Sequence, residues 1–318
     1  MSRPHFLKHS LLSLAILSTF SSQAFPSNNW LTERAGYYHI VNLKNQSSVQ
    51  NVWATWDNSI PEAKFVFLAD AVNDISFPLV ELKNLSLTVN DVHSNNLLSI
   101  STLELFGNYT NQVRSTDLSL TIQNSTLNNT SINTVFLGTI KEANLGNTSL
   151  IMNSSLADGA MAVFSQNNQN LTTDGTFLNV EKSEVKESLS GIYNHNSAFV
   201  LSDYGENGQP DEPTQLMVDL RNTDLEISES IANSVKGIDI NLSLTEKSEL
   251  AGEALGVSLN GQIDTVNVNI NDQSKVSYVA GVSSSIYSSE KGNGQRELSA
   301  YSDLSISNVT VQLLSLIH

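Results

Sequence analysis

The sequence predicts an all-β fold, a solenoid of stacked coils that each consist of strands and turns. Short segments alternate apolar and polar residues with the period of two that a half-buried strand requires. Their ends recur at intervals of 24 to 40 residues, which suit solenoid coils and are too long for hairpins. The clearest repeat pairs residues 240–244 with residues 266–270, because each is followed by a polar turn and then by a second, glycine-containing strand.

Eight segments carry this alternation, and we expect each to place its apolar side chains in the interior. They are residues 85–89, 118–122, 150–152, 178–180, 216–220, 240–244, 266–270 and 304–306. Helices are disfavoured throughout, because Ser, Thr and Asn are abundant and no long segment has a 3.6-residue period.

The turns between these segments are rich in Asn, Asp, Ser and Thr, as at Asn124 and Asn153. Asn and Asp tolerate the left-handed backbone that a tight corner needs, and stacked Asn side chains can form amide ladders. A glycine precedes an apolar residue at four positions, which predicts a bend or a close backbone approach there. These glycines are Gly191, Gly237, Gly256 and Gly281.

Residues 1–24 have the features of a secretory signal peptide. Arg3 and Lys8 form a basic start, residues 11–20 are apolar, and small residues lead up to Ala24. The apolar stretch is shorter than the roughly 20 residues that span a bilayer. We therefore expect export, cleavage between Ala24 and Phe25, and no membrane-spanning segment in the mature chain.

Residues 25–80 differ in composition, because all three tryptophans and the apolar run 64–68 lie there. A solenoid exposes raw strand edges at its ends, and an aromatic-rich cap would cover the first of them. A carbohydrate platform made of Trp53 and Trp56 is the alternative, but residues three apart in a strand face opposite sides. The sequence therefore predicts an N-terminal cap over 25–80 and a β-helix over 81–312.

Composition narrows the functional classes. The chain has 318 residues, no cysteine and a formal net charge of −16. Without cysteine it has no disulfide, no thiol catalysis and no Cys-metal site. An acidic surface disfavours nucleic acid and anionic membranes as partners, and it is typical of a solvated, secreted protein.

No constellation of residues points to catalysis or to a cofactor. Apart from the leader and the last residue, the histidines are His39, His93 and His195, which lie far apart and form no ligand pair. Serine-hydrolase elbows, phosphate-binding glycine loops and calcium nonapeptides are absent. We therefore expect no enzyme, no metal and no cofactor.

A polysaccharide-degrading β-helix is the enzymatic alternative, and it would need clustered carboxylates on one face. Two groups would qualify: Asp264, Asn269 and Asp272 near Lys275, and Asp219 with Arg221. Outward polar residues are expected on any strand, so a solvated face is the simpler interpretation. Specific recognition should lie on the polar loops 203–214 and 288–296, where packing does not constrain the sequence.

The sequence resembles the passenger region of bacterial autotransporters of the pertactin-like or adhesin-like branch. The resemblance rests on the leader, the lack of cysteine, the acidic Asn/Ser/Thr-rich composition and the coils from about Leu85 to Gln312. It implies a right-handed parallel β-helix that is displayed on, or released from, the cell surface or outer membrane. It also implies a role in adhesion, with a host-cell protein or glycan as the receptor.

Autotransporters also carry a C-terminal translocator, a membrane β-barrel, which we expect to be missing from this chain. Residues 313–318 resemble the translation of a sequencing-library transposon adapter, so we expect a truncated, non-native end there. Three functions are compatible with the sequence: an adhesive passenger, a secreted carbohydrate-active enzyme, and a passive stalk for a missing domain.

Overall fold

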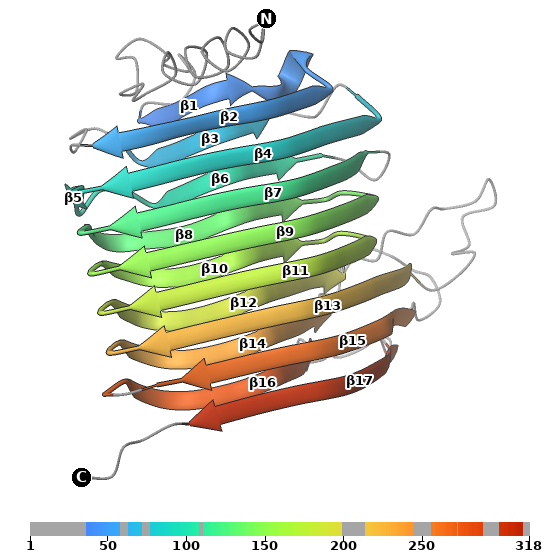
Figure 1. Cartoon of the computed structure of the whole chain (residues 1–318). Coiled ribbons are helices and arrows are strands. Elements are labelled where there is room, and N and C mark those ends of the chain that lie inside the picture. The colour runs from blue at the N-terminus through green and yellow to red at the C-terminus, as the bar shows by residue number, and fades with distance from the viewer. Residues whose placement is uncertain are drawn as a thin grey trace, which may run out of the picture.

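The computed structural model describes residues 36–57, 63–71, 77–107, 111–198, 214–244, 256–271, 273–288 and 299–313. This part of the chain is almost entirely β-strand and forms two parallel sheets, A and B. Each coil contributes a long strand to each sheet in turn. In Figure 1 the front strands run right to left and the rear strands left to right as the chain descends, so the coil is right-handed. The predicted parallel β-helix is confirmed.

Sheet A is the rear sheet of Figure 1. Its strands, in spatial order, are β1 (Tyr37–Asn42), β3 (Phe65–Ala71), β6 (Ser99–Phe106), β8 (Thr126–Gly138), β10 (Leu156–Gln166), β12 (Glu184–Ala198), β14 (Ile231–Leu244) and β16 (Lys275–Ser288), and the short β5 (His93–Ser94) also pairs with β8. Sheet B comprises, in spatial order, β2 (Ser48–Asp57), β4 (Leu79–Asn90), β7 (Gln112–Gln123), β9 (Glu142–Asn153), β11 (Asn170–Glu181), β13 (Thr214–Ser228), β15 (Gly256–Ile270) and β17 (Ser299–Leu313). A short 3₁₀ turn, η1 (Leu43–Asn45), joins β1 to β2.

The register of sheet B confirms the first half of the predicted strand alignment. One inward row runs through Val89, Ile122, Met152 and Val180, each of which ends a predicted segment, and it continues through Ile227, Ile270 and Leu313. The predicted segments 216–220 and 304–306 lie earlier on their strands, β13 and β17. The predicted segment 240–244 is a strand with Ile240 and Leu242 buried, but it belongs to β14 in sheet A.

Two features of the fold explain why the predicted segments do not all fall in one row of one sheet. Both sheets alternate with a period of two, and the bend in each strand of sheet B divides it into two alternating halves. The repeat between residues 240–244 and 266–270 therefore joins strands of different sheets. The coils also differ in length, since the aligned serines Ser155 and Ser183 are 28 residues apart whereas Ser183 and Ser230 are 47 apart.

Apolar rows fill the space between the sheets. Leu85, Leu118 and Ile122 are fully buried, and Leu242, which was predicted to face inward, is 1% exposed. Burying such a side chain stabilises the fold by about 1.5–3 kcal/mol relative to leaving it in water. Ladder hydrogen bonds and these rows hold a chain that has no cysteine for a disulfide.

Every strand of sheet B bends where one residue adopts the left-handed conformation. These residues are Asn51, Asn84, Asp117, Asn147, Gly175, Asn222, Thr265 and Asn308, with φ between 39° and 86°. Asn and Asp dominate because their short polar side chains tolerate this conformation. Amide bonds link these bends rather than the turns for which an amide ladder was predicted: Asn84 Nδ2 donates to Asn51 Oδ1 at 2.8 Å and Asn147 Nδ2 donates to Asp117 Oδ1 at 2.9 Å.

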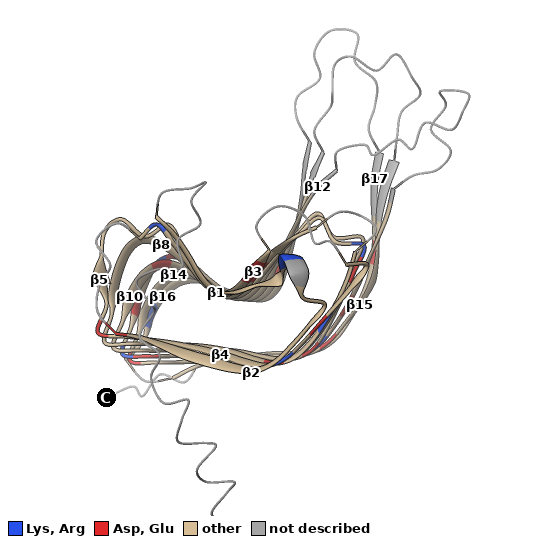
Figure 2. Ribbon diagram, turned by 90° about the horizontal axis from the view of Figure 1, so that it is seen from above, with Lys and Arg blue, Asp and Glu red and all other residues tan. Residues whose placement is uncertain are grey.

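Sheet A bends toward sheet B at a column of small residues. The hydroxyls of Thr102 and Thr134 donate to the carbonyls of Ser119 and Ser149 in sheet B. Further along the column, a Cβ on Gly191 would lie 2.6 Å from the Gly237 carbonyl oxygen. The column continues through Ala162, Gly191, Gly237 and Gly281. A close backbone approach is thus confirmed at Gly191 and Gly237, whereas a Cβ on Gly281 would meet the side chain of Val309. Sheet A is concave on its outer side in Figure 2.

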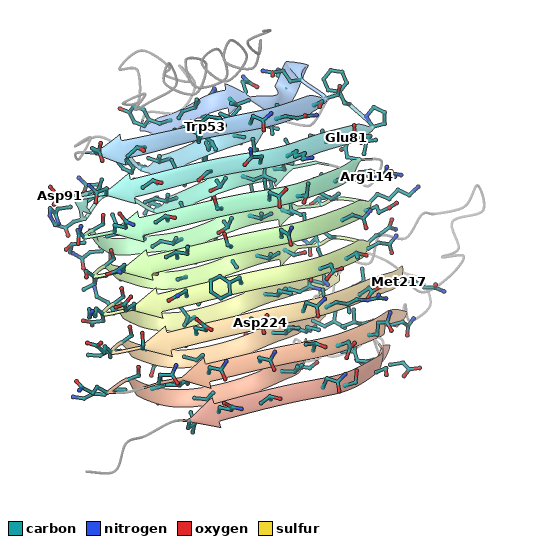
Figure 3. The ribbon with its side chains drawn as sticks, in the orientation of Figure 1. Trp53, Glu81, Asp91, Arg114, Met217 and Asp224 are labelled. Atoms are coloured by element: carbon teal, nitrogen blue, oxygen red, sulfur yellow. The ribbon has the colours of Figure 1, made fainter. Side chains whose placement is uncertain are left out.

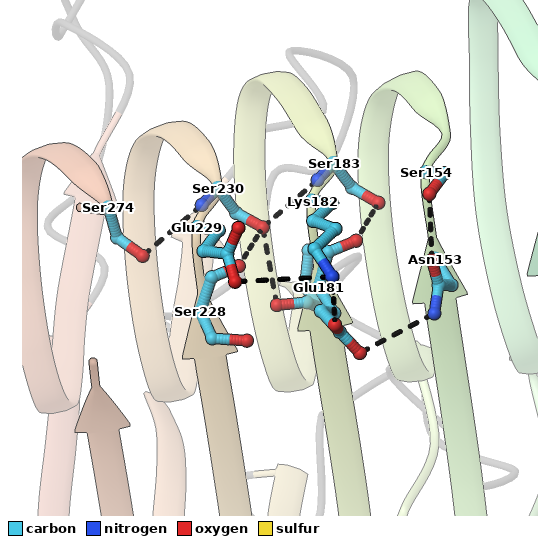
Figure 4. A network of polar contacts seen from close by, with 10 residues as sticks. Asn153, Ser154, Glu181, Lys182, Ser183, Ser228, Glu229, Ser230 and Ser274 are labelled. Carbon is cyan, nitrogen blue, oxygen red and sulfur yellow. Dashed lines mark hydrogen bonds and ion pairs between the residues drawn. The ribbon is translucent and has the colours of Figure 1, made fainter. Parts of the chain in front are cut away.

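A ladder of serines closes the turn from sheet B to sheet A. In five coils a left-handed residue is followed by a serine: Ser125, Ser155, Ser183, Ser230 and Ser274. The backbone N–H of each of the first four donates to the Oγ of the next serine at 3.0–3.2 Å. The Oγ atom of each of the first four serines also donates to the carbonyl two residues earlier at 2.7–2.8 Å, as Figure 4 shows for part of the ladder. The serines thereby satisfy backbone donors at each corner.

The described part of the segment 25–80 continues the same two sheets. It supplies β1, β2, β3 and the start of β4, and Trp53 is the register partner of Ser86. Within residues 36–57 and 63–71 no separate cap is formed. Trp53 is 41% exposed and Trp56 is 2% exposed, so the two rings face opposite sides, as their spacing predicts.

Candidate functional site

The outer face of sheet B carries a column of small polar side chains between two aromatic rings. Successive strands place Trp53, Ser86, Ser119, Ser149, Phe177 and Asp224 in register. These side chains face outward because their neighbours in each strand, such as Leu118 and Leu120, face the core. Trp53 and Asp224 are labelled on this face in Figure 3. Four strand spacings, about 19 Å, separate Trp53 from Phe177.

Ser119, Ser149, Phe177 and Asp224 of this column line a groove of about 440 Å³, which we call the sheet B groove. It spans five adjacent strands, from β4 to β13. Its lining consists of Asn84, Asp117, Leu118, Ser119, Asn147, Thr148, Ser149, Gly175, Thr176, Phe177, Asn222 and Asp224. The groove lies where serine and glycine leave space that larger side chains would fill.

Gly175 keeps the middle of the groove open. Its φ is +86°, and a Cβ there would lie 2.8 Å from Asn147 Oδ1. The other left-handed positions that line the groove carry Asn or Asp, so glycine at this rung removes a side chain as well as relieving backbone strain. The half-buried ring of Phe177 stands two residues further along the same strand.

Polar side chains in the groove are held by bonds to one another. The Ser119 hydroxyl donates to Ser86 Oγ at 2.8 Å, and Asn147 Nδ2 donates to Asp117 Oδ1 at 2.9 Å. Asp224 Oδ1 accepts from Asn267 Nδ2 at 2.7 Å. Asp117 and Asp224 each use one carboxylate oxygen in these bonds, so the lining combines oriented acceptors, amide donors and hydroxyls that can do both.

A row of alternating charge runs beside the groove. Asp174, Arg221 and Asp264 are register partners on β11, β13 and β15. Arg221 donates to both oxygens of Asp219 at 2.7 and 2.8 Å, and these bonds raise the pKa of Arg221. The Ser307 hydroxyl and the Asn308 amide donate to Asp264 and hold the pKa of its carboxyl below the usual range.

The structure brings together one of the two carboxylate groups that the sequence suggested. Asp219 and Arg221 form an exposed ion pair at 2.7 Å. Asp264 and Asn269 lie on the same extended strand, five residues and roughly 17 Å apart, whereas Lys275 begins β16 in sheet A. Asp272 lies outside the described residues. The predicted cluster around Asp264 is therefore wrong, because strand length separates its members.

The histidines do not meet. His39 Nδ1 lies 3.6 Å from Asp70 Oδ2, His93 Nε2 lies 3.5 Å from Asp91 Oδ1, and His195 stacks on Tyr193 with centroids 6.2 Å apart. Within the described ranges, no three His, Asp or Glu side chains converge as a metal site would require. No helix in that part of the chain is long and apolar enough to cross a membrane.

Sheet A carries an aromatic ladder that the sequence analysis missed. Rings of Phe106, Phe136, Phe164 and Tyr193 follow one another on adjacent strands, with centroids 4.5–5.1 Å apart. Phe136 and Phe164 are parallel to within 7°. The signal was an aromatic residue recurring about once per coil, but it becomes visible only when the strands of sheet A are aligned separately. Phe136 and Phe164 thus use one face of each ring on the other, while the outer two pairs are tilted by 48° and 35°.

Several predicted sites lie outside the described residues, namely the cleavage site between Ala24 and Phe25 and almost all of the loops 203–214 and 288–296. Comparison with known proteins identified no relative: no family model, curated protein or solved structure matches this chain. Function must therefore be argued from the fold and the groove.

Proposed function

We propose that this chain is the exported passenger of an autotransporter-like system, displayed on or released from the cell surface, where it adheres to a host-cell protein or glycan without catalysis. The observation that supports this best is the sheet B groove, an indentation of about 440 Å³ in the outer face of sheet B. Its lining supplies hydroxyls, amides, carboxylates and one ring, which are binding groups.

The construction of the solenoid suits a protein that works outside the cell. Each coil is held on the previous one by ladder bonds and apolar rows, so folding requires no oxidising environment. A net charge of −16 favours solubility. The predicted leader would direct the chain to export.

Adhesion of coated beads to cultured host cells and to matrix proteins tests this function. We expect beads that carry the purified chain to bind, and beads that carry a Ser119→Trp variant, in which the indole fills the groove, to bind much less. Circular dichroism confirms that both proteins are folded. Failure of the unmodified chain to bind any surface would refute the adhesive function, and equal binding by both would place the receptor site elsewhere.

A carbohydrate-active enzyme is the second candidate, and one cluster favours it. Asp70 and Glu104 are register partners on adjacent strands of sheet A. Asp70 is fully buried, accepts a hydrogen bond from the Tyr37 hydroxyl at 2.7 Å and lies 3.6 Å from His39. Two neighbouring carboxylates are the minimum for glycoside hydrolysis. Release of reducing sugar from a polysaccharide panel, abolished in Asp70→Asn, would support the enzyme; absence of product across the panel would exclude it.

A further inference from the structure

The sheet B groove has a geometry that selects among classes of ligand. We propose that it binds an uncharged oligosaccharide that lies along the solenoid axis, across the strands, from Phe177 toward Trp53. This inference rests on the proposed adhesive function and names the chemical class of its receptor.

The regular spacing of serine hydroxyls along the column supplies the first argument. Ser86, Ser119 and Ser149 present hydroxyls on consecutive strands, at the spacing of about 4.8 Å that sheet hydrogen bonding imposes. A pyranose chain repeats its hydroxyls at a similar interval, so consecutive sugars can meet consecutive strands in similar geometry. A ligand without an internal repeat would use only part of the row.

The polar lining supplies the second argument. A sugar hydroxyl both donates and accepts, so it needs partners of both kinds. Serine hydroxyls provide both, Asn147 and Asn222 provide amides, and Asp117 and Asp224 provide carboxylate acceptors. The two carboxylates are already oriented by amide bonds of 2.9 and 2.7 Å, so binding would order few additional side chains.

The aromatic residues supply the third argument. Phe177 lies between Ser149 and Asp224 in the column and gives the groove an apolar wall against which the C–H face of a sugar ring can pack. Trp53, 41% exposed, lies about four strands away, at a distance that about four sugar units would cover. The sequence suggested Trp56 as the partner of Trp53, and the fold supplies Phe177 instead.

The charge of the groove and the pairing of its strands exclude two other classes of ligand. An anionic glycan would meet Asp117, Asp174 and Asp224, while the nearby cation Arg221 is bonded to Asp219. An extended peptide binds a sheet through backbone groups at an open edge, whereas the strands that form this groove are paired on both sides and present only side chains. An uncharged, hydroxyl-rich chain satisfies both constraints.

A glycan panel tests the proposal. Neutral linear and branched oligosaccharides of two to eight sugars, together with sialylated and sulfated ones, are screened against the full purified chain, and hits are titrated calorimetrically. We expect a neutral ligand to bind, with affinity rising up to about four sugars and then levelling off. Phe177→Ser, which gives this rung the residue found three times earlier in the column, should weaken binding about tenfold or more.

Two further variants make the result interpretable. Asp117→Asn retains a residue suited to the left-handed backbone and should weaken binding through loss of the anionic acceptor. Met217→Ser is the matched control, because it also replaces an exposed apolar residue of sheet B, outside the groove, and it should leave affinity unchanged.

Binding of anionic glycans alone, no binding of any neutral glycan, or full affinity in Phe177→Ser would overturn the proposal. The bead assay separates this failure from that of the parent function. If beads adhere to cells but the neutral panel is negative, adhesion stands and the ligand class is wrong. If neither is positive, the adhesive function itself fails.

Discussion

Replacing Ser155 by alanine removes one rung of the serine ladder and tests how successive coils are held together. Ser155 Oγ accepts from the Ser125 N–H at 3.1 Å and donates to the Asn153 carbonyl at 2.8 Å. The methyl group of alanine can do neither. The Asn153 carbonyl keeps its bond from the Asn124 N–H at 3.0 Å, so the loss falls mainly on the buried Ser125 N–H.

A buried donor that loses its acceptor costs about 1–3 kcal/mol. We expect Ser155→Ala to lower the local free energy of unfolding by that amount. Ser183→Ala should have the same effect one coil further on, because Ser183 Oγ accepts from the Ser155 N–H at 3.1 Å. Ser86→Ala is the control: its hydroxyl faces outward, where water can replace the lost bond, and the change should stay below about 0.5 kcal/mol.

Native-state hydrogen exchange is the appropriate assay, because a solenoid unfolds in local units that a single melting curve averages. The Ser125 amide should exchange about 5- to 150-fold faster in Ser155→Ala, the equivalent of ~1–3 kcal/mol. Unchanged protection of Ser125, or an equal loss of protection in Ser86→Ala, would refute the argument that these hydroxyls secure the corners.

Four other outcomes follow from the structure. Gly191→Ala should destabilise by about 1–3 kcal/mol in chemical denaturation, because its Cβ would lie 2.6 Å from the Gly237 carbonyl oxygen on the adjacent strand and 2.7 Å from Thr223 Cγ2 of sheet B. Gly159→Ala, with its nearest atom at 3.8 Å, should cost little, and similar costs for both variants would contradict this close packing. Leu242→Asp should abolish cooperative melting, and an unchanged melting curve would mean that this side chain does not face inward. The carboxyl of Asp264 should have a pKa below 3.8 when it is titrated by NMR, so its stabilising contribution is complete above that pH and is lost as the pH falls below it. Ser307→Ala should move this pKa back toward 3.8. A pKa at or above 3.8 in the unmodified chain would exclude the hydrogen bonds from Ser307 and Asn308. Backbone amides of β17 should show the fastest hydrogen exchange among the described strands of sheet B, because Val309 and Val311 face inward yet are 41% and 42% exposed. Greater protection in β17 than in β9 would contradict this.

The alternation of apolar and polar residues was sufficient to predict a β-solenoid and most of its inward rows. Leu85, Leu118 and Leu150 were placed in the core because a period of two can bury only one side of a strand. The left-handed corner at Asn124 was also predicted, since few residues other than Gly, Asn and Asp adopt that conformation readily, whereas at the next corner Ser154 adopts it rather than Asn153. These features depend on local preference, which the sequence carries directly.

The sheet to which each strand belongs could not be predicted in the second half of the chain. Residues 240–244 and 266–270 look equivalent because both alternate in the same way, yet they lie in different sheets. The serine ladder was hidden for a similar reason, because its members are separated by 28 to 47 residues and the left-handed residue before each one varies.

By itself, the sequence determined the class of fold, the rows that fill the core and the corners that turn the chain, because each depends on residues close together in sequence. Only the tertiary structure decided which residues from different coils stand side by side. Ser86, Ser119 and Ser149 form one outward column, and Phe177 rather than Trp56 aligns with Trp53, because register is set by backbone pairing over whole coils of unequal length. The candidate binding site is therefore a product of register, and local sequence preferences do not specify register between distant coils.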